Sequence, residues 1–155
     1  AKQYHVYTIL NAAPAKEMDR EVLKMVDCLI VNETEASFYA GADMTDGDMV
    51  RAHADRLRQL TDGTVIVTLG SKGSMLLGEE GAVPIDPVKV ERVTESTGAG
   101  DSYIGAFAYG KFKGMTDLQA CCFAARAASV TVTKIGAQEA MPCLSEMNES
   151  RLPDV

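Results

Sequence analysis

The chain has 155 residues, of which 46% are hydrophobic and 24% charged, and its formal net charge at pH 7 is −7. This length and composition fit one globular domain of ordinary size. The negative charge argues against a nucleic-acid-binding surface, and no apolar run approaches the roughly 20 residues that a membrane-spanning helix needs.

The cysteines and histidines do not indicate a metal site or a disulfide framework. The four cysteines contain no C-x-x-C pair, and the adjacent Cys121 and Cys122 suit neither purpose. His53 falls among charged residues of an expected helix, where a solvated or partly buried structural role is favoured. The N-terminal residues show no signal-peptide pattern, so we expect a reducing, cytoplasmic setting. The absent initiator Met and an early strand indicate a chain that begins within a fold.

Strand and helix patterns alternate through the first half of the chain. Buried strands are expected over residues 6–10, 28–31 and 64–69, and helices over residues 19–26, 32–39 and 45–60. In the longest of these helices, one apolar stripe is formed by Val50, Ala54, Leu57 and Leu60. The alternation predicts a parallel sheet with right-handed crossovers.

The pattern changes in the second half. Short apolar segments at 75–77 and 83–85 flank a turn and predict a β-hairpin, and the pattern over 89–93 favours another short strand. Helices are expected over 101–113 and 116–132, the second with a face of small alanines. Residues 145–155 form a polar tail that we expect to be loosely held. The predicted fold class is α/β, with a parallel sheet flanked by helices and a hairpin on its C-terminal side.

The segment Gly98-Ala99-Gly100-Asp101 is the clearest functional signal in the sequence. Three consecutive positions without large side chains let backbone N–H groups converge on an anion, and a helix that opens here adds partial positive charge. An anion would repel the carboxylate of Asp101, whose presence is explained if it accepts a proton during phosphoryl transfer. The alternative is a glycine-rich turn with Asp101 as a helix cap.

Two further segments follow predicted strands. Asn32 can cap the helix that begins after it, and Glu35, three residues on, completes a capping box. The same oxygens suit a phosphate–magnesium site, and the two roles are compatible. Residues 68–73 follow the clearest strand at its C-terminal end, where ligands bind in open α/β sheets. The alternative there is a plain strand-to-hairpin turn.

Five segments together resemble the ribokinase-like (PfkB) family of carbohydrate kinases, with ribokinases as the nearest members. Residues 94–103 resemble the family's second signature, Asp-Thr-x-Gly-Ala-Gly-Asp followed by Ser or Thr and an aromatic residue. The other matching segments are Asn11-Ala12-Ala13-Pro14-Ala15, Val31-Asn32-Glu33-Thr34-Glu35-Ala36, Thr68-Leu69-Gly70-Ser71-Lys72-Gly73 and Lys134-Ile135-Gly136-Ala137-Gln138. They occur in family order and span nearly the whole chain, which implies a ribokinase-like fold with a Rossmann-like sheet.

The resemblance implies a role for each matched residue. Asp101 would be the base that accepts the proton of a sugar hydroxyl, and Gly98, Ala99 and Gly100 would form the anion hole for the transferred group. Glu35 would bind magnesium through water. The residues implied to contact ATP are Asn32, Thr68, Gly70, Ser71, Gly73 and Ala125, the last of which could equally be a helix-packing alanine.

Family members often carry a monovalent cation, such as K⁺, beside the anion hole, bound mainly by backbone carbonyls. Here the implied site comprises Glu95, Thr97, Thr131, Lys134 and Gly136. Glu95 departs from the usual Asp, and its extra methylene moves the carboxylate by about one bond length, whereas the backbone carbonyls do not depend on the side chain.

The family's first signature, sugar-binding Asp, Gly-Gly hinge and small β lid are absent from this sequence. We therefore expect residues 1–144 to be the C-terminal, nucleotide-binding and catalytic portion of a kinase domain, without its N-terminal half and lid.

The complete protein is expected to be a homodimer that phosphorylates a sugar, using ATP and Mg²⁺. Ribose is the leading acceptor. Fructose, a deoxy sugar acid or a nucleoside are alternative acceptors. A truncated fragment that binds nucleotide or a partner without catalysis is the alternative function. No nucleic-acid or membrane partner is expected.

Overall fold

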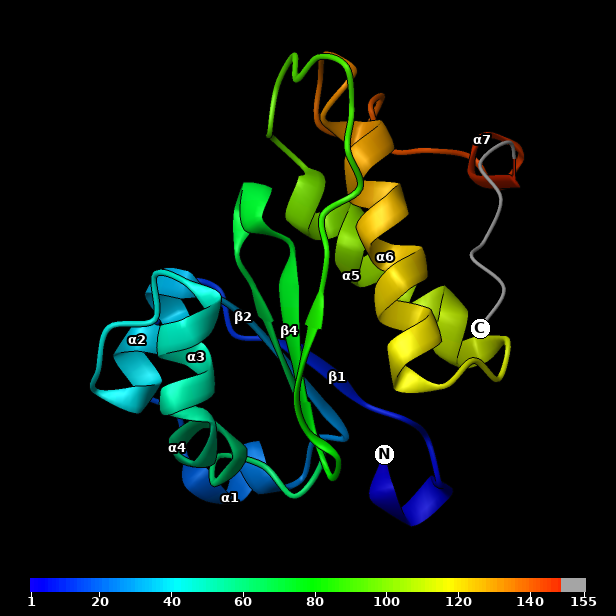
Figure 1. Ribbon diagram of the computed structural model, residues 1–155. Helices are drawn as coiled ribbons and strands as arrows, with labels where there is room; N and C mark the ends of the chain where they lie inside the picture. Colours follow the sequence, from blue (N-terminus) through cyan, green and yellow to red (C-terminus); the bar gives the residue numbers. More distant parts are fainter. Residues whose placement is uncertain (149–155) are drawn as a thin grey trace. The chain divides into compact units, whose positions relative to one another are not determined.

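The computed structural model describes residues 1–148, which fall into two compact units divided after Ile85 (Figure 1). Within residues 1–148, no helix combines the length and apolar character that crossing a membrane requires.

The first unit is built on a five-stranded sheet in which the strands lie in sequence order. Its strands are β1 (Ile9–Asn11), β2 (Cys28–Asn32), β3 (Thr64–Thr68), β4 (Ser74–Gly78) and β5 (Gly81–Ile85). The first three are parallel, whereas β4 runs antiparallel to β3 and forms a hairpin with β5. This mixed sheet confirms the predicted alternation and the predicted hairpin.

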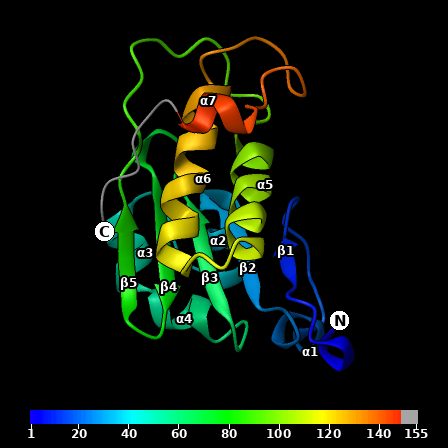
Figure 2. The ribbon, with the colours of Figure 1, turned by 90° about the vertical axis from the view of Figure 1, so that its right-hand side faces the viewer.

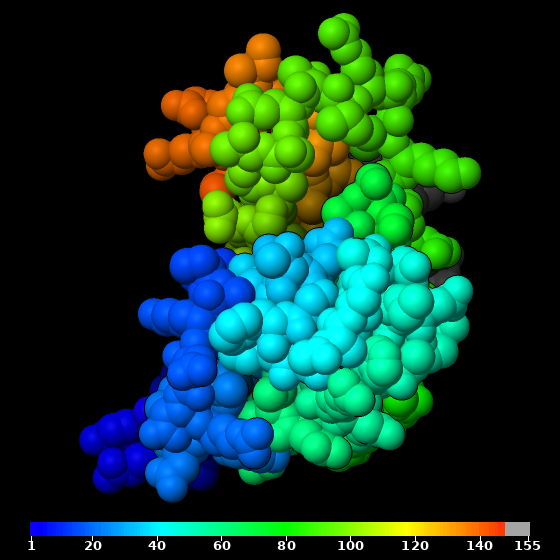
Figure 3. Space-filling model, turned by 90° about the vertical axis from the view of Figure 1, so that its left-hand side faces the viewer, coloured from blue at the N-terminus to red at the C-terminus, as the bar shows by residue number. Residues whose placement is uncertain are grey.

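Helices cover one face of this sheet. They are α1 (Arg20–Lys24), α2 (Glu33–Ala40), α3 (Gly47–Ala52) and α4 (Ala54–Arg58), with short 3₁₀ turns η1 (Lys2–Tyr4) and η2 (Gly70–Lys72). Alternate strand residues, including Val31, Val65 and Leu77, pack with Ala36 and Leu57 of the helices in one buried core. The space-filling view shows α2, α3 and α4 as a continuous outer layer of this unit (Figure 3).

Two predicted elements differ from the structure in this unit. The helix expected over 45–60 is two helices, α3 and α4, that meet at His53, whose φ of −116° and ψ of 15° are not helical. Val50 and Leu57 are nevertheless both fully buried, as the apolar stripe predicts. The first strand begins at Ile9 rather than at residue 6, because Val6 and Tyr7 remain exposed.

The second unit is helical in its described part. Helices α5 (Ala99–Phe112) and α6 (Asp117–Thr131) lie side by side as a hairpin, and α7 (Leu144–Asn148) packs against α6 (Figure 2). A Cβ atom at Gly110 would lie only 3.0 Å from Cβ of Ala120, so small residues permit the close approach of α5 and α6. This confirms the packing predicted from the alanine face.

The strand predicted over 89–93 is wrong, since residues 86–98 contain no helix or strand. None of residues 89–93 is buried: Val93 is 62% exposed and Val90 is only partly buried, so the segment lacks the buried face that a half-buried strand requires. Of the segment predicted as a polar tail, residues 145–148 lie in α7, and Met147 is buried against Phe123. The remainder of that prediction, residues 149–155, lies outside the described residues.

Candidate functional site

The candidate nucleotide residues of the first unit lie where β2 and β3 end. Asn32 and Thr68 are the last residues of these neighbouring parallel strands and are paired in register. The hydroxyl of Thr68 donates to the carbonyl oxygen of Val31 at 3.4 Å. The structure therefore brings two of the predicted residues to the carboxyl edge of the parallel strands, the usual ligand edge of such sheets.

Asn32 and Glu35 form the reciprocal capping box of α2. The backbone N–H of Glu35 donates to Oδ1 of Asn32 at 2.9 Å, and the N–H of Asn32 donates to Oε2 of Glu35 at 2.8 Å. Glu35 is only 4% exposed. Within the described residues, hydrogen bonds reach Oε2 of this carboxylate but not Oε1. A carboxylate oxygen with spare acceptor capacity fits a magnesium-bound water, so the capping role and the metal role are compatible.

Residues 69–73 turn the chain from β3 into β4. The N–H of Leu69 donates to the carbonyl of Gly73 at 2.8 Å, which closes the loop around η2. Gly70 and Gly73 have φ values of 54° and 87°, a left-handed backbone that favours glycine. Ser71, at the tip, is exposed. The loop therefore presents the Ser71 side chain to solvent from a backbone with fixed geometry.

In the second unit, helix α5 opens on the predicted anion-binding turn. Gly98 caps the helix with φ of 79°, and a Cβ atom there would lie 2.9 Å from the carbonyl oxygen of Ala137, so only glycine fits. The N–H of Ala99 donates to the carbonyl oxygen of Ser96 at 3.2 Å, and the N–H of Ser102 donates to the carbonyl oxygen of Gly98 at 2.9 Å.

The hydrogen bonds of this turn show which of its N–H groups are available. Among the described residues, the N–H groups of Gly98, Gly100 and Asp101 donate to no protein acceptor, whereas that of Ala99 is used within the turn. The N–H of Asp101 was not predicted from the sequence. Its availability follows from its place in the first helical turn, where N–H groups lack helical partners.

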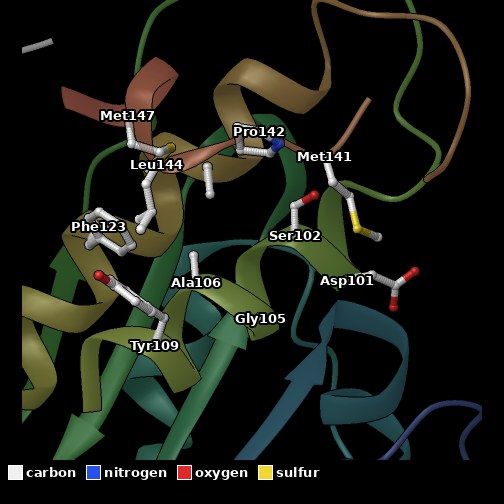
Figure 4. A pocket seen from close by; sticks show the side chains of 11 residues that line it. Asp101, Ser102, Gly105, Ala106, Tyr109, Phe123, Met141, Pro142, Leu144 and Met147 are labelled. Carbon is white, nitrogen blue, oxygen red and sulfur yellow. The ribbon is translucent and has the colours of Figure 1, made fainter. Parts of the chain in front are cut away.

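The carboxylate of Asp101 is exposed in the first turn of α5. It stands at one end of a cavity of about 200 Å³ whose other wall includes Tyr109, Phe123 and Met147 (Figure 4). In the close-up, the Asp101 side chain points away from the aromatic end of this cavity. An exposed carboxylate beside free N–H groups can accept a proton from a group held at the turn.

The candidate cation residues come from two segments that the structure joins. The N–H of Gly136 donates to Oε2 of Glu95 at 3.1 Å. This hydrogen bond, together with one from the Thr97 side chain, holds the pKa of Glu95 below its usual value. The structure thus brings Glu95, Thr97 and Gly136 together.

Thr131 and Lys134 are largely committed to other contacts. The Thr131 hydroxyl is fully buried and hydrogen-bonded to Ser102, and the Thr131 carbonyl accepts the N–H of Lys134 at 3.1 Å. The ammonium of Lys134 pairs with Glu146. Backbone carbonyls have two lone pairs, so oxygen donors for a monovalent cation remain, but the side chains of these two residues do not supply them. Ala125 lies half-buried on α6.

Comparison with known proteins gives one consistent result. The profile described as "pfkB family carbohydrate kinase" matches residues 1–144. A ribokinase of Staphylococcus aureus (strain COL) is 36% identical over 150 residues, which cover 96% of this chain and 49% of that protein. The chain thus spans about half the length of the curated relatives it matches.

Solved structures agree with the sequence matches. Arabidopsis thaliana ribokinase, solved with ribose and ATP, superimposes with a TM-score of 0.88 at 30% identity, covering 96% of this chain and 48% of that one. A nucleoside kinase from Methanocaldococcus jannaschii, described as an archaeal member of the ribokinase family, gives a TM-score of 0.71 at 28% identity. That match covers 92% of this chain and 47% of the nucleoside kinase.

Proposed function

Because the chain belongs to the pfkB family of carbohydrate kinases, we propose that it is the nucleotide-binding and catalytic portion of a kinase that transfers a phosphoryl group from ATP to a sugar hydroxyl. The observation that carries this proposal is the turn at the start of α5. It combines an exposed carboxylate with three N–H groups that have no acceptor within residues 1–148. This is the pairing that phosphoryl transfer needs, namely charge stabilisation and a base.

In the proposed step, the acceptor oxygen attacks the γ-phosphorus of ATP and the bond to the β-phosphate oxygen breaks, releasing ADP. The carboxylate of Asp101 takes the proton that the acceptor hydroxyl loses. The N–H groups of Gly98, Gly100 and Asp101 donate to the phosphoryl oxygens as negative charge moves through the transition state. Ala99 contributes by shaping the turn, since its own N–H is used there.

The residues proposed to contact ATP are Asn32, Thr68, Gly70, Ser71, Gly73 and Ala125. Glu35 would hold a water of a magnesium ion, which supplies neutralising charge for the phosphates when bound. A monovalent cation such as K⁺ would take carbonyl oxygens near Glu95, Thr97, Thr131, Lys134 and Gly136.

Ribose is the proposed acceptor, because several of the similar proteins are ribokinases, one of them solved with ribose and ATP. Fructose, a deoxy sugar acid or a nucleoside are the competing acceptors, and the similarity to a nucleoside kinase supports the last. The complete kinase is proposed to be a cytoplasmic homodimer.

A second candidate function follows from the coverage of half of each relative. On its own the chain would then bind nucleotide or a partner protein without catalysis. The two candidates differ in whether the segment is joined to an acceptor-binding half.

The decisive experiment changes Asp101 to Asn in the complete kinase and measures ADP release with ribose, fructose and nucleosides. We expect turnover to fall by about 10²–10⁴, the usual contribution of a general base, while ATP binding is retained. Asp86→Asn, the same chemical change at an exposed residue of the same unit, is the matched control. Near-normal kcat in the Asp101 variant would contradict the assignment.

A further inference from the structure

Two segments of the second unit are joined by several contacts on one side of the anion-binding turn. The N–H groups of Thr94 and Glu95 donate to the carbonyl of Val132 at 2.7 and 3.3 Å. The hydroxyl of Thr94 donates to the carbonyl of Thr133 at 3.0 Å. These bonds fix the backbone of residues 94–95 against residues 132–133.

Glu95 adds side-chain contacts between the same two segments. Its carboxylate accepts the N–H of Gly136 at 3.1 Å and a hydrogen bond from Thr97. Gly98 directly follows Thr97, and Ala137 directly follows Gly136. The backbones of Gly98 and Ala137 approach each other closely. The carboxylate therefore lies between a backbone anchor at Val132 and the turn itself.

We propose that Glu95 is a positioning residue, whose carboxylate holds residues 134–137 against residues 95–98 and thereby sets the turn that leaves the N–H groups of Gly98, Gly100 and Asp101 free. The value of this arrangement for catalysis rests on the proposed function. The positioning itself is a property of the described fold and can be tested without activity.

The length of the Glu95 side chain is what the geometry requires. Its backbone is held by the bond to Val132, so it cannot advance toward Gly136 without breaking that bond. An aspartate would be shorter by one carbon–carbon bond, about 1.5 Å. Starting from 3.1 Å, its carboxylate would fall outside hydrogen-bond range of the Gly136 N–H.

Amide hydrogen exchange of the 155-residue chain, followed by NMR, tests the positioning. In Glu95→Ala we expect the Gly136 amide, together with the turn amides of Ala99 and Ser102, to exchange about tenfold faster, as the loss of one hydrogen bond allows. Glu95→Asp should behave like Glu95→Ala. Glu95→Gln, whose side-chain carbonyl can still accept, should stay near the wild type.

Two controls separate this effect from general loosening. Glu91→Ala removes an equal charge from an exposed position of the same segment and should change none of these amides. Amides in the middle of α6, such as that of Ala124, should keep their protection in every variant. Faster exchange at Gly136 alone, with Ala99 and Ser102 unchanged, would overturn the proposal. Amide exchange as fast in Glu95→Gln as in Glu95→Ala would also overturn the proposal. The role would then belong to the negative charge, as in a cation ligand, and not to the hydrogen bond.

A second readout uses the complete kinase. Glu95→Ala should lower kcat about tenfold with KM for ATP nearly unchanged, because the turn acts on the transferred group. Glu95→Gln should restore most of the loss. If exchange responds as expected and kcat does not, the positioning stands and the proposed function of the turn is wrong.

Discussion

The hydroxyl oxygens of Ser102 and Thr131 lie 2.7 Å apart in the interior of the second unit. Thr131 is completely buried and Ser102 is 6% exposed, and the Thr131 hydroxyl also lies 3.0 Å from the carbonyl oxygen of Ala127. Ser102 directly follows Asp101, so this buried pair ties the first turn of α5 to the last turn of α6. A buried hydroxyl costs free energy when it has no hydrogen-bond partner. The pair therefore holds the start of α5 in place next to the candidate base.

We predict that Thr131→Val destabilises the protein by about 1–3 kcal/mol, because the change leaves the Ser102 hydroxyl without its buried partner. Urea unfolding measures the difference. Thr133→Val removes an exposed hydroxyl that donates to the Val130 carbonyl within its own turn, and it should change stability by less than about 0.5 kcal/mol. Equal effects of the two substitutions would contradict the importance of the buried pair.

A second prediction concerns Asp27 in the first unit. Burial raises the pKa of this carboxyl, but hydrogen bonds from Lys2 and from the hydroxyl and N–H of Thr8 outweigh burial and hold the pKa below 3.8. The folded state therefore favours the charged form. The resulting stability is present above pH 3.8 and is lost as the pH falls through the lower pKa of the folded protein.

We therefore expect Asp27→Asn to reduce the free energy of unfolding by about 1–2 kcal/mol at pH 7 and by progressively less below pH 4. Denaturant unfolding at several pH values measures this convergence with the wild type. Asp62→Asn is the control, since Asp62 is paired with Lys24 but 74% exposed and should contribute almost nothing. A wild-type advantage that stays constant down to pH 3 would assign the effect to packing instead of charge.

Much of the fold was predictable from local patterns. The hydrophobic run at β3 and the turn signals around β4 and β5 depend on a few neighbouring residues, and the structure has these strands where expected. The break at His53 was not predictable in this way, because no Gly or Pro marks it. The error at residues 89–93 has the same origin, since alternation predicts a strand only where another strand is available to pair.

The candidate site likewise combines local features that the sequence predicts with long-range contacts that it does not predict. The sequence predicts the turn at Gly98 and the capping box of Asn32, both of which are local arrangements. It does not predict that Glu95 bonds to Gly136 or that Ser102 bonds to Thr131, since these contacts join residues 41 and 29 positions apart. Such pairs are set by how α5 and α6 pack, which no single segment encodes.

A third prediction concerns monovalent cations. If carbonyl oxygens near Thr131 and Gly136 hold a cation, replacing sodium with potassium should raise the activity of the complete kinase, because the larger ion fits a ring of carbonyls with less dehydration cost. Steady-state rates in sodium, potassium and a large organic cation at constant ionic strength measure the effect. Equal rates in all three salts would rule out the site.

The last prediction concerns the edge of the sheet. Within the described residues, the edge strand β1 pairs only with β2, and exposed apolar side chains lie close before it in sequence, with Tyr4, Val6 and Tyr7 exposed by 75%, 56% and 43%. An open parallel edge with apolar neighbours favours association. We expect the 155-residue chain to self-associate, or to bind a co-expressed N-terminal half of the family fold, and light scattering measures its mass. Val6→Lys should weaken this association, whereas Ile135→Lys, at a position 77% exposed in the other unit, should not.

The chain alone should release no ADP with ribose, because transfer needs a bound and oriented acceptor. A monomer that phosphorylates ribose would contradict both the proposed role of the edge and the assignment as part of a larger kinase.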